Sequence, residues 1–251
     1  MVYIKKEILS GVREYKFLII LAAYIIFALL DPLMLKFLPM LVSGQLGDID
    51  ITQAITLNQP TAIMNSISSN YQIISLVIAI SLMGIVANEL KNNSVVIPSV
   101  LGLDLKKWII SKFVVYSTFI IIVSIIAQVV TNIYALTLFD GRTIALVASL
   151  KVGMLIGLFH SFILAMVLLF GTLSKRQGIA AFASLTIAFL LPTFSKVLDI
   201  VWYTPAGLIA EAKYLVSYFS VDGITAVLMS IALIITVLLL TVNVVEYKEL
   251  V

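Results

Sequence analysis

The feature that most constrains this chain is a series of six long apolar runs, separated by segments that carry most of its charge. A helix of about 20 apolar residues matches the thickness of the hydrocarbon core of a bilayer. Within lipid such a run must be helical, because every backbone polar group needs a partner inside the segment. The sequence therefore predicts an all-α integral membrane protein, one transmembrane domain over 1–251, with spans at 17–42, 72–88, 108–135, 146–170, 179–198 and 224–242.

Composition excludes several other classes of protein. Hydrophobic residues make up 62% of the chain and charged residues only 12%, whereas soluble domains average about 45–50% and about 25%. The net charge of +3 is spread among short segments between the spans, so nucleic-acid binding is not expected. There is no cysteine, which rules out disulfides and thiolate metal sites.

The distribution of basic residues predicts the orientation. We assign eleven of the 16 lysines and arginines to the side that holds both termini, and five to the other side. Short cytoplasmic segments carry the excess of positive charge in membrane proteins. We therefore expect a multi-pass protein of a bacterial-type cytoplasmic (plasma) membrane with both termini in the cytoplasm.

The segment 1–16 precedes the first span and has an amphipathic pattern. Apolar side chains recur at helical spacing, so we predict an interfacial helix lying along the membrane surface, in contact with lipids. A plain basic flank to the first span is the alternative. The basic residues of this segment are Lys5, Lys6, Arg13 and Lys16.

Two ionisable residues inside the spans are candidates for a transport pathway, since such residues are costly in lipid. Asp31 precedes Pro32, and we predict that the helix breaks there and restarts with Asp31 as its cap. His160, the only histidine, falls in mid-span, where a neutral side chain hydrogen-bonded to a neighbouring helix is the alternative. Lys151 is expected to extend towards the interface.

Small residues recur every four positions in the fourth span. This spacing forms a low ridge that allows another helix to approach closely. We predict a helix-packing face, within the subunit or between subunits, formed by Ser149, Gly153, Gly157 and Ser161.

The charged stretch 87–112, ANELKNNSVVIPSVLGLDLKKWIISK, lies between the second and third spans. Glu89 ends one helix, and Asp104 fits the N-cap of the next, with Lys106, Lys107 and Trp108 in its first turns. A short basic helix that continues into a span can transmit a movement of a bound soluble protein to the membrane-spanning part of the chain. The alternative is an ordinary basic loop in contact with lipid headgroups and water.

Motifs of catalysis are absent from the sequence. There is no GxxxxGK[ST] phosphate loop, no HExxH and no GxSxG. We therefore expect no enzymatic activity and no cofactor bound by the chain itself.

The segment ANELKNNSVVIPSVLGLDLKKWIISKFVV resembles the cytoplasmic segment of ABC-2 type permeases, in which a span ends in Glu and a "LLS.P" run, a turn and a basic helix follow. FALLDPLMLKFLPMLV is similar to that family's "LLSPL…K.LP" pattern in the first span. The chain departs from the family at 92–93 and 101–104, and Asp31 replaces a small hydroxyl residue.

This resemblance implies one of the two subunits that form the membrane part of an ATP-driven exporter. It would pair with a second copy or a sister permease and with two cytoplasmic ATPase subunits that bind ATP and magnesium. The expected cargo is hydrophobic or amphipathic, such as a peptide, drug or antibiotic. The implied coupling residues, in a cytoplasmic coupling helix between spans 2 and 3, are Glu89, Pro98, Asp104, Lys106, Lys107 and Trp108.

Two other functions remain open at this point. An ATP-independent secondary transporter or channel would use acids inside the membrane and paired interrupted helices. A membrane immunity or anchor protein would need no docking loop.

Overall fold

The computed structural model describes residues 2–46, 57–92, 104–140 and 143–249, and these contain helices and no strand. Six helical stretches are long and apolar enough to cross a membrane, which confirms the predicted all-α class and indicates a multi-pass membrane protein. The first stretch is α2 (Lys16–Leu46). The second is a run of four consecutive elements, α3 (Gln59–Ser69), η2 (Asn70–Ile74), α4 (Ser75–Leu82) and α5 (Gly84–Lys91). The other four are α7 (Leu105–Leu138), α8 (Leu146–Ser174), α9 (Gln177–Val197) and α11 (Val221–Glu249).

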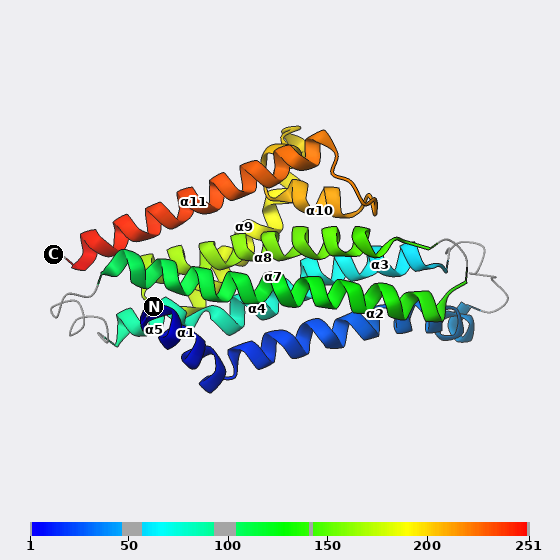
Figure 1. The fold of residues 1–251 in the computed structure, drawn as a ribbon, viewed down its shortest axis with the longest axis horizontal. Helices are drawn as coiled ribbons and strands as arrows, with labels where there is room; N and C mark the ends of the chain where they lie inside the picture. The colour runs from blue at the N-terminus through cyan, green and yellow to red at the C-terminus, as the bar shows by residue number, and fades with distance from the viewer. Residues whose placement is uncertain (1, 47–56, 93–103, 141–142, 250–251) are drawn as a thin grey trace.

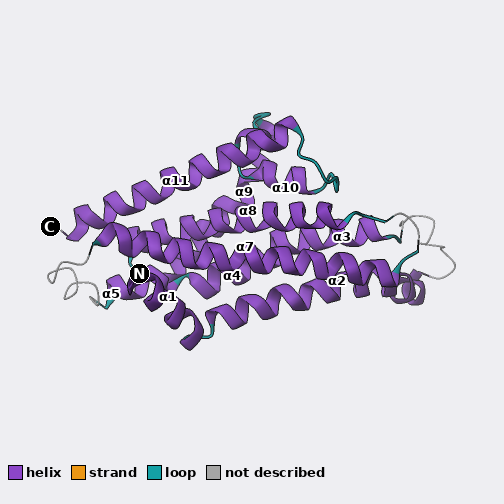
Figure 2. Ribbon diagram, viewed as in Figure 1, coloured by secondary structure: helices purple, strands orange, loops and turns teal. Residues whose placement is uncertain are grey.

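The long helices run roughly along one axis, and both termini lie at the same end, on the left of Figure 1. We call this the terminal end: α5 finishes there and α7 begins there. Helix α8 is the centre of the bundle, with 83% of its most apolar window buried, against 28% for α9 and for α11. Between α9 and α11 the chain forms the short helices η3 (Val201–Tyr203) and α10 (Ala206–Ala212), and nearly all of the described chain is helix (Figure 2).

The second membrane helix begins earlier than the sequence predicts. The run starts at Gln59 instead of residue 72, so part of the stretch between the first two predicted spans is helical. Asn58 caps it, accepting a hydrogen bond from Thr61 N at 3.0 Å, and Pro60 occupies the first turn. The polar side chains of this helix can be buried because they meet polar partners on α7. For example, Gln128 Nε2 on α7 donates to Ser66 Oγ at 3.2 Å.

The predicted break at Asp31 and Pro32 is wrong, because α2 continues through both residues. Pro32 has no N–H, so the carbonyl of Ala28, four residues earlier, loses its helical donor. Thr131 Oγ1 on α7 lies 3.3 Å from that oxygen and 3.0 Å from its own Ala127 O, so a neighbouring helix supplies a donor. Asp31 is therefore not a cap; its Oδ1 accepts from Ser69 Oγ at 2.8 Å.

The ridge of small residues on α8 packs inside the subunit. A Cβ at Gly153 would lie 2.5 Å from Ile125 Cα, and one at Gly157 would lie 2.8 Å from Ile121 Cα, so neither position admits a side chain. Ser124 Oγ donates to Gly153 O at 2.8 Å across this contact. Ser149 and Ser161 are buried on the same helix. At Gly153 and Gly157 the helix that approaches this ridge is α7.

Candidate functional site

A sharp corner places the N-terminal helix against the terminal end of the bundle. Helix α1 (Val2–Arg13) is followed by Tyr15, whose φ of 57° is left-handed, and α2 starts at Lys16. The turn directs α1 back across the first turns of α7 (Figure 1). Glu7, in the middle of α1, is thereby buried against the bundle.

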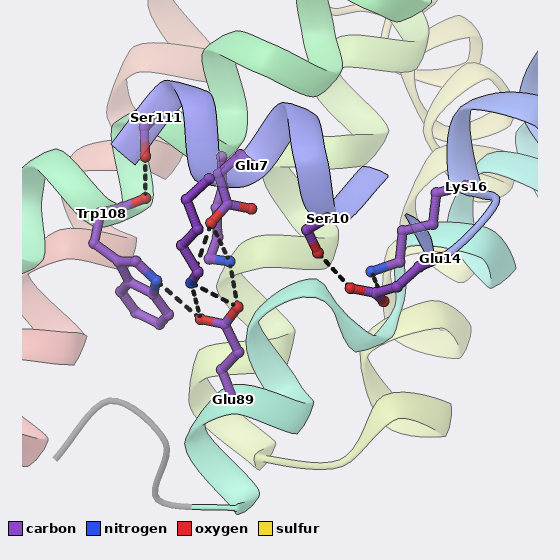
Figure 3. A network of polar contacts seen from close by, with 9 residues as sticks. Glu7, Ser10, Glu14, Lys16, Glu89, Trp108 and Ser111 are labelled. Atoms are coloured by element: carbon purple, nitrogen blue, oxygen red, sulfur yellow. Dashed lines mark hydrogen bonds and ion pairs between the residues drawn. The ribbon is translucent and has the colours of Figure 1, made fainter. Parts of the chain in front are cut away.

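Lys112 on α7 is the centre of a buried charge cluster. Its Nζ lies 3.0 Å from Glu7 Oε1 on α1 and 2.9 Å from Glu89 Oε1 on α5, and its side chain is 1% exposed. Figure 3 shows Glu7 and Glu89 converging from two different helices. One ammonium group therefore joins three helices, of which α1 is far in the sequence from α5 and α7.

Two further side chains complete the cluster around Glu89. Trp108, one turn before Lys112, donates from Nε1 to Glu89 Oε2 at 2.9 Å, and the Lys112 ammonium lies 5.2 Å from the centroid of the Trp108 ring. Lys6 Nζ lies 3.1 Å from Glu89 Oε1 and 3.4 Å from Glu7 Oε1. We call Lys6, Glu7, Glu89, Trp108 and Lys112 the charge cluster.

The charge cluster is electrically balanced, with two carboxylates and two ammonium groups. Burial tends to lower the pKa of Lys6, but the attraction of Glu89 and Glu7 outweighs it, so that pKa lies above its ordinary value. Balanced, hydrogen-bonded charges tolerate a low-dielectric site that an isolated charge would not. The cluster can therefore hold α1, α5 and α7 together as one unit.

The predicted coupling residues separate into two groups. Glu89 and Trp108 belong to the charge cluster, whereas Asp104, Lys106 and Lys107 lie outside it, on the first turn of α7. Pro98 and the rest of 93–103 lie outside the described residues. The coupling helix expected around Asp104 and Trp108 is the start of α7, and its coupling role stays a prediction.

The start of α7 presents an exposed charged edge. Asp104 is the N-cap, as predicted: its Oδ1 accepts from Lys107 N at 3.1 Å, and Lys107 Nζ lies 2.9 Å from Asp104 Oδ2. The hydrogen bonds from Lys107 hold the pKa of Asp104 below its ordinary value. Lys106 Nζ lies 3.6 Å from Glu246 Oε1 at the end of α11, and the Lys106 and Lys107 side chains are 60% and 70% exposed. A soluble partner can reach both lysines.

The remaining basic residues of the expected interfacial helix have separate environments. Lys5 and Arg13 are exposed on α1, while Lys16 begins α2 and pairs with Glu14 at 2.7 Å. Burial tends to raise the pKa of Glu14, but hydrogen bonds from Lys16 and Ser10 lower it by more, so this pKa lies below its ordinary value. Ile8 and Val12 are exposed on α1, consistent with an apolar face left free for lipid.

Sequence reasoning missed Glu7 and Lys112 as members of a site. Both had a local signal. Glu7 lies between apolar positions of an amphipathic helix, and Lys112 lies one turn after Trp108, on the same face. A charge on an otherwise apolar helix face indicates that it has a partner, although the sequence does not identify the partner.

His160 is hydrogen-bonded to two neighbouring helices, as its alternative interpretation predicts. Its Nε2 lies 3.1 Å from Asn70 O, and because a carbonyl only accepts, Nε2 carries a proton. Its Nδ1 lies 2.5 Å from Tyr24 OH, which can then donate to it. Asn70 opens the π-helical turn η2, where its carbonyl also accepts from Ser75 N. His160 therefore ties α2 and the second membrane helix to α8.

Lys151 is part of a second buried pair and does not extend towards the interface as expected. Its Nζ lies 2.8 Å from Glu211 Oε1 on α10 and 3.0 Å from Tyr218 O. Ser220 donates to Glu211 from Oγ at 2.6 Å and from its N–H at 3.2 Å. This pair fastens α10 and the segment before α11 to α8, at the half of the bundle opposite the terminal end (Figure 1).

Within the described ranges no group of three or more His, Cys, Asp or Glu side chains could hold a metal ion. The geometry at the terminal end is suited to transmitting force between helices.

No protein-family model matches the chain, and no curated protein matches its sequence.

Proposed function

We propose that this chain is the membrane subunit of an ATP-driven exporter of the ABC-2 type. A separately encoded cytoplasmic ATPase would bind at the terminal end, and the bundle would move a hydrophobic or amphipathic cargo outwards. The complex would contain two ATPase subunits and a second permease, either a copy of this chain or a sister. Both termini would then lie in the cytoplasm.

The charge cluster is the observation that carries this proposal. Lys112 joins the end of the second membrane helix, the start of the third and the N-terminal helix through contacts of 2.9 and 3.0 Å. A force applied to the segment between α5 and α7 would therefore move three helices together. A basic loop that only touches headgroups would not need this internal bracing.

The cluster is connected to the rest of the bundle by further contacts. Gln177, at the start of α9, donates to Asn88, which neighbours Glu89. Lys106 pairs with Glu246 on α11. A push at the start of α7 would thus reach α9 and α11 as well, and these two helices have the largest share of unburied positions. They are the elements with most freedom to move, or to meet a second permease.

Co-purification of the tagged chain from its native host in mild detergent tests the proposal. Mass spectrometry should identify an ATPase with a GxxxxGK[ST] loop in the purified complex, at one copy per chain if the second permease is a copy of it and at two if it is a sister. Such a partner is expected because the exposed side chains of Lys106 and Lys107 lie at this end, and the full sequence has no nucleotide-binding loop of its own.

Purification of the chain without any ATPase would contradict the export proposal. The ATP-independent transporter or channel would then be the better account, and Asp31 and His160 would be its first candidate residues. An immunity or anchor function would be favoured if neither an ATPase nor any transported molecule were found.

A further inference from the structure

A cavity of about 420 Å³ opens between α2 and α3. Helix α3 lies towards the end of the bundle opposite the termini (Figure 1). This volume is within the range of small-molecule sites. Its walls combine apolar and neutral polar side chains: Met34, Leu35 and Leu38 from α2, and Met64, Asn65 and Ser68 from α3. Methionine side chains adapt to ligands of different shape. The cavity therefore suits an amphipathic molecule.

Asp31 extends the same stripe of α2 that lines this cavity. It precedes Met34 and Leu35 by three and four residues, which places it on their face of the helix, one turn closer to the terminal end. Its hydrogen-bond partner Ser69 directly follows Ser68, which lines the cavity from the other side. Asp31 is not itself part of the lining, and its carboxyl group lies about one helical turn from it, beyond the end of the cavity nearer the termini.

Among the described residues, the carboxyl group of Asp31 has no counter-charge. The residue is 6% exposed, Oδ1 accepts from Ser69 Oγ at 2.8 Å, and Oδ2 has no partner among the described residues. No ion pair joins it to a lysine or arginine in that part of the chain, whereas Glu7, Glu89 and Glu211 are each paired with a lysine. A buried acid inside a membrane helix is retained where it has a partner or a function.

We propose that this cavity binds an amphipathic organic cation, with the apolar part between α2 and α3 and the positive group facing Asp31. The apolar walls bury the apolar part of the ligand, and the carboxylate favours a ligand of positive charge, because complementary charges give a binding site its specificity. The inference rests on the proposed export function, because within that function it identifies the cargo as a cation. Binding itself needs neither the ATPase nor ATP.

Tetraphenylphosphonium and tetraphenylborate test the proposal, because they have the same shape and opposite charges. Equilibrium dialysis against the purified chain in zwitterionic nanodiscs, corrected with empty discs, should give saturable binding of the phosphonium only. Asp31→Asn should weaken that binding about tenfold or more, because it removes the charge and keeps the shape. Asp222→Asn, which removes an exposed acid at the start of α11, should leave it unchanged.

A second variant separates loss of the site from loss of the fold. Asn65 is exposed and lines the cavity, so Asn65→Trp should fill it and block binding while Asp31 stays in place. Equal binding of both ions, binding of neither, or an unchanged affinity in Asp31→Asn would overturn the proposal. If an ATPase co-purifies while the phosphonium does not bind, only the cargo class fails; if binding is found without an ATPase, only the export proposal fails.

Discussion

Replacing Lys112 by methionine should lower the free energy of unfolding by about 3–5 kcal/mol, the cost of removing one partner from a buried ion pair. Methionine keeps much of the apolar stem but removes the ammonium that contacts Glu7 and Glu89. Glu89 retains Trp108 and Lys6, whereas Glu7, with a side chain only 2% exposed, keeps only Lys6 among the partners that the described residues supply. Denaturant unfolding of the purified chain in mixed micelles measures the change.

A matched variant and a double variant make this prediction specific. Lys107→Met on the same helix should change stability by less than about 0.5 kcal/mol, because that lysine is exposed. Lys112→Met with Glu7→Gln should recover most of the loss, since removing both charges leaves no uncompensated ion in the buried site. A Lys112→Met protein as stable as the wild type, or a double variant that recovers nothing, would show that the cluster does not brace the helices.

Replacing Glu211 by glutamine should have an effect of similar size, about 3–5 kcal/mol. The carboxylate is fully buried, and its loss leaves the Lys151 ammonium, 2% exposed, with the carbonyl of Tyr218 as its remaining close acceptor among the described residues. The double variant Lys151→Met with Glu211→Gln should recover much of that stability. The same unfolding measurement checks both variants, with Asp222→Asn as an exposed control on α11.

The same pair predicts a dependence on pH. Burial tends to raise the pKa of Glu211, but the hydrogen bonds from Lys151 and Ser220 lower it by more. In the folded protein this pKa therefore lies below its ordinary value of 4.5. A lowered folded-state pKa gives stability that is complete above the ordinary value and is lost as the pH falls through the folded value. Wild-type stability should therefore fall below about pH 4.5 more steeply than that of the double variant. Equal slopes in acid would contradict the pairing.

Local sequence patterns predicted the parts of the fold that depend on neighbouring residues. Apolar length identified the membrane helices, because a run of that length in lipid has only one regular structure available. The N-cap at Asp104 and the close contact at Gly153 and Gly157 follow from residues within a turn or two of each other. Proline was misleading at position 32, because a side chain of a distant helix compensates for the missing N–H.

The partners of the buried charges could not be predicted in the same way. Lys112 and Glu7 are 105 positions apart, and Lys151 and Glu211 are 60 apart, so each pair depends on how the helices pack. The sequence identified Glu89 and Trp108 through a loop pattern but gave no reason to join them to α1. Likewise, the polar residues after Gln59 resembled a loop until their partners on α7, such as Gln128, were known.

The most direct test of the account asks whether the exposed edge of α7 is where the ATPase binds. Lys106→Glu with Lys107→Glu reverses two exposed charges at the terminal end. Lys196→Glu with Lys213→Glu makes the same charge change at exposed positions in the last turn of α9 and directly after α10, and serves as the control. The account predicts that wild type and control retain a co-purifying ATPase and that the first variant loses it. An ATPase retained equally by all three proteins, or present in none, would contradict it.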